Sequence, residues 1–118
     1  MATKKKEDAT TDAMANSKEL DNKKFVTDRL LATGRVGMEG LIQYMEGIGF
    51  FSAPCSGGNH LCCEFGLVQH TRNVMVAAES VGRALLGDER FEEISDSVTI
   101  AAALHDLGKC GDYGKQMY

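Results

Sequence analysis

The 118-residue chain contains no long apolar run, no N-terminal secretory signal and only one proline. A membrane-spanning helix needs about 20 consecutive apolar residues and a secreted protein needs a signal, so we expect a cytoplasmic protein without membrane contact. No alternation of apolar and polar residues is long enough to indicate a strand. These absences predict an all-α fold, and a hydrophobic fraction of 43% suits the core of one small domain.

Positive charge is scarcer than negative charge, and the formal net charge is −4. A field of this sign repels phosphates, so binding to duplex nucleic acid is not expected. The four cysteines include no C-x-x-C pair, and in a reducing compartment they are expected to be core or reactive thiols. A structural zinc site in one loop is a competing interpretation, but adjacent cysteines do not easily reach one tetrahedral ion. Its four residues would be Cys55, His60, Cys62 and Cys63.

The N-terminal segment differs in composition from the rest of the chain. Residues 1–22 are polar and charged, which predicts a disordered tail, and a helical domain is expected over 23–118. A short helix near Phe25 is expected to break at Thr33-Gly34-Arg35. A second amphipathic helix is expected from Met38 to Met45, ended by two glycines. The proline-containing segment 50–60 is expected to be a loop that lies against the site.

The longest helical pattern runs from Gly66 to Leu86. Its apolar residues and one histidine recur at spacings of three and four, so this face is predicted to point toward the core: Leu67, His70, Val74, Ala77, Val81 and Leu85. After a loop at 87–90, a final helix is expected to start near Asp96 or Ser97 and to include the next histidine. It is expected to end before Gly108, which suits a left-handed cap.

His105 and Asp106 are adjacent in an otherwise apolar helical segment. Burying an imidazole and a carboxylate together is costly unless each finds a partner, and a divalent cation satisfies both. A partner helix must supply the remaining ligand, and His70 provides it. These three residues predict a metal site with positions open for water and substrate. The competing interpretation is an ordinary helical interaction domain, in which both histidines are core residues and Asp106 caps a helix or forms an ion pair.

Two short runs carry a resemblance to a known family. Gly66-Leu67-Val68-Gln69-His70-Thr71 and Leu104-His105-Asp106-Leu107-Gly108-Lys109 resemble the HD-domain metal-dependent phosphohydrolases. With Thr33-Gly34-Arg35, the Phe50–Pro54 segment and His60, the resemblance to bacterial and phage members covers roughly Leu30 to Tyr113. It implies a partial HD-like helical bundle that hydrolyses a nucleotide or another phosphoester.

The resemblance also implies a cofactor and roles for individual residues. One or two divalent ions (Mn, Fe, Ni, Zn or Mg) would be held by His70, His105 and Asp106, with Asp106 as the bridge between two ions. His60 would contact substrate or act as an extra ligand, unless it is simply an exposed loop histidine. Lys109, which with Asp106 is a candidate catalytic residue, would contact a substrate phosphate. Alternatively, Lys109 only stabilises a helix C-terminus.

The chain departs from the family pattern at the fourth ligand, which is an aspartate on a later helix. Asp112 is too close to Asp106 to be an obvious substitute. The sequence therefore predicts either a truncated product of a longer protein or a short form that binds metal poorly. The rival function is a non-catalytic or remnant HD-like module used for binding or regulation. Apolar surface left by the missing helix would favour a homodimer.

Overall fold

The computed structural model describes the backbone of residues 2–55 and 64–111, and side-chain environments from Ser17 onward within these ranges. Four α-helices and one short 3-10 helix make up this part of the chain: α1 Ala2–Ala32, α2 Met38–Gly47, α3 Gly66–Leu86, α4 Asp88–Leu104 and η1 Leu107–Cys110. Residues 2–55 and 64–111 contain no strand, so the predicted all-α class is confirmed. Among the same residues, no helix combines the length and apolarity needed to cross a bilayer.

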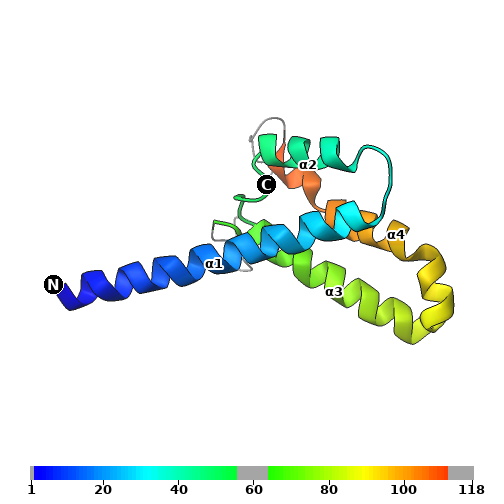
Figure 1. Ribbon diagram of the computed structural model, residues 1–118, viewed down its shortest axis with the longest axis horizontal. Coiled ribbons are helices and arrows are strands. Elements are labelled where there is room, and N and C mark those ends of the chain that lie inside the picture. Colours follow the sequence, from blue (N-terminus) through cyan, green and yellow to red (C-terminus); the bar gives the residue numbers. More distant parts are fainter. Residues whose placement is uncertain (1, 56–63, 112–118) are drawn as a thin grey trace.

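The helices are arranged around an antiparallel hairpin formed by α3 and α4 (Figure 1). Helix α1 contacts α2, α3 and α4, and its N-terminal half extends beyond them (Figure 1). Because α3 and α4 run in opposite directions, the start of α3 lies beside the end of α4. Residues that are 35 positions apart in the sequence therefore meet at this end of the hairpin.

The core lies between the C-terminal half of α1, the end of α2 and the first turns of α3. Its largest fully buried side chains are Phe50, Leu30, Met45, Leu67, Val26, Val68, Thr71 and Cys110. Apolar side chains four residues apart on α1 share one face, as helical periodicity requires. The segment after α2 packs against the core through Phe50 and Phe51, whose rings meet edge to face with their centroids 5.2 Å apart.

Helix α1 is longer than the sequence pattern predicts. The expected disordered tail over residues 1–22 is helical from Ala2 in the structure. No glycine or proline precedes Gly34, and the segment is rich in alanine and lysine, which favour helix. Within the expected tail, Asn22 is buried and donates from Nδ2 to Gln69 Oε1 at 2.8 Å. The predicted break after this helix is present, because α1 ends at Ala32.

Helix α4 begins earlier than predicted. The expected loop at 87–90 is reduced to Gly87, and the helix starts at Asp88 rather than near Asp96. Gly87 takes φ 81°, and two acidic residues follow in the first turn, where the helix dipole favours negative charge. The turn between α3 and α4 is therefore much tighter than the sequence pattern suggests.

The buried face of α3 is rotated from the predicted one. Leu67 is fully buried, but Val81 is 56% exposed and Leu85 is 79% exposed. Besides Leu67, the buried positions of α3 are Gly66, Val68, Thr71 and Met75, which the predicted face does not include. This rotation follows from α1 and α4, which both contact α3 and select the face that is covered. It leaves the His70 side chain at the edge of the core, with 23% of its surface exposed.

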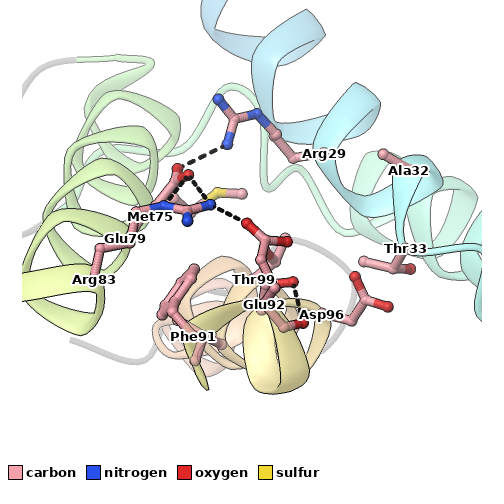
Figure 2. Close-up of a pocket in the computed structure, with 12 residues that line it drawn as sticks. Arg29, Ala32, Thr33, Met75, Glu79, Arg83, Phe91, Glu92, Asp96 and Thr99 are labelled. Carbon is pink, nitrogen blue, oxygen red and sulfur yellow. Dashed lines mark hydrogen bonds and ion pairs between the residues drawn. The ribbon is translucent and has the colours of Figure 1, made fainter. Parts of the chain in front are cut away.

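Close packing at the hairpin turn depends on Gly82. A Cβ atom at this position would lie 2.5 Å from the Phe91 ring, which is closer than real contacts allow. Arg83 covers the same ring, with its guanidinium carbon 4.7 Å from the ring centroid. Figure 2 shows the Arg83 guanidinium between the carboxylates of Glu79 and Glu92. The turn end of the hairpin is therefore held by an arginine that lies on an aromatic ring and binds carboxylates.

Candidate metal centre

The three predicted metal ligands come together at the open end of the hairpin. His70 lies in the second turn of α3, His105 is the C-cap of α4, and Asp106 follows it. The Nε2 atoms of the two histidines are 3.2 Å apart. Asp106 Oδ2 lies 3.2 Å from His70 Nε2 and 3.1 Å from His105 Nε2. Three potential donor atoms thus form a nearly equilateral triangle.

The edges of this triangle match those of a metal coordination shell. Nitrogen and oxygen ligands lie about 2.0–2.2 Å from ions such as zinc, so neighbouring ligands in tetrahedral or octahedral shells are about 2.8–3.6 Å apart. The three measured separations, between 3.1 and 3.2 Å, fall in that range. One cation can therefore contact all three atoms without a large movement of any side chain.

The local backbone at the doublet differs from the predicted helix. Helix α4 ends at Leu104, and the backbone of Asp106, with φ −113° and ψ 13°, is no longer α-helical. This turn allows Asp106 Oδ2 to lie beside His105 Nε2, although adjacent residues on a helix point about 100° apart. The predicted left-handed cap at Gly108 is also wrong, because Gly108 lies inside η1. Gly111, with φ 63°, takes the positive φ instead.

The orientation of the His105 ring is set by the backbone of α4. Nδ1 of His105 lies 2.7 Å from the carbonyl oxygen of Ala102. A carbonyl only accepts, so Nδ1 donates to it, and Nε2 is the ring nitrogen that faces His70 and Asp106. A hydrogen bond of this kind supports metal-binding histidines, because it fixes both the tautomer and the ring.

Lys109 lies at the same cluster. Its Nζ donates to Asp106 Oδ2 at 3.2 Å and to Cys55 Sγ at 3.7 Å. Burial lowers the pKa of Lys109, but the hydrogen bond and charge of Asp106, with a smaller contribution from Cys55, outweigh it and the net pKa is raised. Lys109 is therefore an ammonium near neutral pH, which is the form needed to contact a phosphate.

Cys55 is a member of the cluster that the sequence reasoning did not assign to the site. Its Sγ, a ring nitrogen of His70 and a carboxylate oxygen of Asp106 all lie within 4.8 Å of one another. The sequence offered one indication of this role, because Cys55 lies in the segment 50–60 that is expected to pack against the site. That loop expectation holds for the described part, since Cys55 is buried beside His70 and Asp106.

Other predicted site residues fall outside the described part of the chain. His60, Cys62, Cys63 and Asp112 belong to the two ranges without described structure, so their predicted roles stay predictions. The described ligands are accessible but sheltered, with 23%, 32% and 20% of the side-chain surface exposed at His70, His105 and Asp106. No family model, curated protein sequence or solved structure matches the chain.

Proposed function

We propose that this chain is a metal-dependent phosphohydrolase of the HD type, acting on a nucleotide or another phosphoester. The single observation that supports this function best is the triangle of His70 Nε2, His105 Nε2 and Asp106 Oδ2, with edges of 3.1–3.2 Å. Its members are the residues of the two sequence runs that resemble the family. The triangle does not depend on that resemblance, because the three distances are properties of this chain.

The donor set fits a divalent transition metal. Two imidazoles and one carboxylate suit Mn, Fe, Ni or Zn, whereas Mg prefers a shell dominated by oxygen. When bound, such an ion supplies Lewis-acid polarisation of a phosphoryl oxygen and a water of lowered pKa. His70 and His105 would hold the ion through Nε2, and Asp106 would hold it through Oδ2.

The charges at the site favour a phosphate once a cation is held. With neutral imidazoles, the Asp106 carboxylate and the Lys109 ammonium cancel, so a divalent ion leaves the cluster with a net positive charge. The Lys109 side chain is 31% exposed, and its flexible stem can direct the ammonium toward an oxygen of the substrate. Lys109 therefore binds and orients phosphate, while Asp106 and the histidines hold the cation.

A second candidate function is a non-catalytic HD-like module for binding or regulation. The observation that favours it is the ion pair between Lys109 and Asp106, because this pair satisfies the carboxylate without a metal ion. A cluster that is already paired within the chain resists metal binding. The two candidate functions differ in whether a bound metal supports turnover.

The test combines metal analysis with a substrate screen. We expect purified protein supplied with Mn, Ni, Zn or Mg to hydrolyse a nucleotide or a generic phosphoester, and to lose this turnover in Asp106→Ala and His105→Ala. Asp96→Ala, a carboxylate on α4 outside the cluster, is the matched control and is expected to keep it. Bound metal without turnover would support the non-catalytic module. Equal, negligible metal in wild type and Asp106→Ala would contradict the metal centre itself.

A further inference from the structure

We infer that Cys55 is a fourth protein donor to this centre, which makes the centre selective for thiolate-binding ions of the zinc class. The inference rests on the proposed metal centre but not on the hydrolytic activity. Family resemblance implies no cysteine ligand. The evidence is the position of Cys55 in this structure, its burial and the groups that surround its sulfur.

The backbone before Cys55 is attached to the first turn of α3. Phe65 N donates to Ser52 O at 2.9 Å, and Leu67 N donates to Ala53 O at 2.9 Å. Two hydrogen bonds of good length therefore hold this segment against the helix that carries His70. Cys55 follows two residues later, so its position relative to His70 is set by the fold.

The sulfur of Cys55 lies near two of the three donors, those of His70 and Asp106. Cys55 is only 3% exposed, and its Sγ is within 4.8 Å of both a ring nitrogen of His70 and a carboxylate oxygen of Asp106. In a shell with Zn–S of about 2.3 Å and Zn–N of about 2.0–2.1 Å, sulfur and nitrogen are about 3.3–3.6 Å apart. The sulfur lies at most 4.8 Å from these two donor atoms, so a movement of about 1 Å or a little more would bring it into the same shell.

The group that lies between the sulfur and the carboxylate is already a cation. Lys109 Nζ is 3.7 Å from Cys55 Sγ and 3.2 Å from Asp106 Oδ2. Cys55 belongs to the hydrophobic core cluster, but apolar packing alone would leave no cation beside its sulfur. Here the sulfur faces an ammonium, which indicates a place where positive charge is stabilised. A metal ion would take over this role, and Lys109 would turn toward solvent or substrate.

A thiolate changes which ion the centre prefers. Soft sulfur ligands favour zinc and similar ions, whereas magnesium and manganese favour oxygen ligands. His70, His105 and Asp106 alone follow the general order of divalent-ion affinity, in which cobalt and zinc bind more tightly than manganese. Cys55 is expected to widen this preference for zinc and cobalt over manganese, and Cys55→Ala is expected to reduce it.

Cobalt is the probe for this inference, because Co²⁺ bound to a thiolate gives a sulfur-to-cobalt charge-transfer band in the near ultraviolet. It also gives visible d–d bands whether or not sulfur is bound. We expect both signals in a full-length variant that keeps Cys55 and carries Cys62→Ser, Cys63→Ser and Cys110→Ala. Adding Cys55→Ala is expected to remove the charge-transfer band and keep the visible bands. Zinc affinity is expected to fall about 100-fold or more, since even outer-shell changes cost 10–100-fold, and manganese affinity to change little.

The outcomes separate the two proposals. Visible bands without a charge-transfer band in the variant that keeps Cys55 would overturn the cysteine ligand and leave the histidine–aspartate centre intact. No cobalt bands in the wild-type protein would overturn the metal centre and the proposed function together. If the triple variant fails to fold, Cys110→Ala and Cys55→Ala are compared singly. Loss of the charge-transfer band only in Cys55→Ala supports the inference, and its retention there contradicts it.

Discussion

The hairpin of α3 and α4 carries a polar cluster at each end, and the two clusters differ in how their charges are balanced. At the turn, Arg83 pairs with Glu79 and Glu92, and Arg29 reaches Glu79 from α1 (Figure 2). Arg83 also pairs with Asp88. At the open end, two imidazoles and one carboxylate converge, and Lys109 is the cation that pairs with the carboxylate.

The difference indicates which end is structural and which is suited to chemistry. The cation at the turn is Arg83 of α3. Its hydrogen bonds, above all the one to Glu92, raise the pKa of Arg83 above the usual value. Beside it lies a cavity of about 160 Å³ whose charged lining includes Arg29, Glu79, Arg83 and Glu92, which are already paired. At the open end, donor atoms converge on a point that an exchangeable cation can reach.

The largest expected effect concerns metal-dependent stability at the open end. Asp106→Asn is expected to abolish the rise in melting temperature that divalent metal causes in the wild type. At a metal concentration of about 100 times Kd, that rise corresponds to about 2.7 kcal/mol of added stability. Glu92→Gln changes a carboxylate of the turn cluster and is the control. It is expected to lower the starting melting temperature while keeping the metal-induced rise, as thermal unfolding with and without metal would show.

The next effect concerns packing at the turn. Gly82→Ala places a methyl group against the Phe91 ring, and we expect a loss of about 1–3 kcal/mol in the free energy of unfolding, as for other overpacked sites. The control is Gly40→Ala in α2, where no heavy atom lies within 4 Å of the added Cβ. It is expected to stabilise the protein by about 0.5–1 kcal/mol. Urea unfolding measures both, and equal effects of the two changes would refute the close contact.

A smaller effect on the melting temperature is expected when Arg83, the cation of the turn cluster, is replaced. Arg83→Met keeps much of the apolar stem but loses the three ion pairs, so we expect a lower melting temperature at low ionic strength. Added salt screens the pairs in the wild type and should narrow the difference. Arg90→Met, a change at an exposed arginine of α4, is the comparison. A difference that does not depend on salt would mean that Arg83 acts through packing on Phe91.

The smallest expected effect is a dependence of the melting temperature on pH, caused by Glu79 at the turn end of the hairpin. The hydrogen bond from Arg29, with help from Arg83, lowers the pKa of Glu79 below 4.5 despite some opposing burial. A lowered folded-state pKa adds stability above the unfolded value, and this stability is lost as the pH falls through the folded value. The melting-temperature gap between wild type and Glu79→Gln should therefore be full at neutral pH and close in acid. Glu93→Gln, at an exposed carboxylate of α4, is the control, and a gap that closes equally in that variant would contradict the role of Arg29 and Arg83.

Local patterns predicted much of the helical order. Gly66 and Leu86 bound α3 as predicted, and α2 begins at Met38, because apolar spacing and flanking glycines are properties of short stretches of chain. The start of α4 was missed because a glycine followed by acidic residues is compatible with either a loop or a tight helix start. The buried face of α3 was misjudged because several faces of that helix carry apolar residues, and only the packed neighbours select one.

In the candidate site, too, some features follow from local sequence and others depend on packing. The chemistry of His70, His105 and Asp106 can be read from residue types and from their places in the two motifs. Their separations of 3.1–3.2 Å, and the approach of Cys55 from a different segment, depend on how α3 and α4 turn back on each other. Side-chain chemistry and helical periodicity are local, so the amino-acid order specifies them. The meeting of distant donors depends on the path of the whole chain, which packing determines.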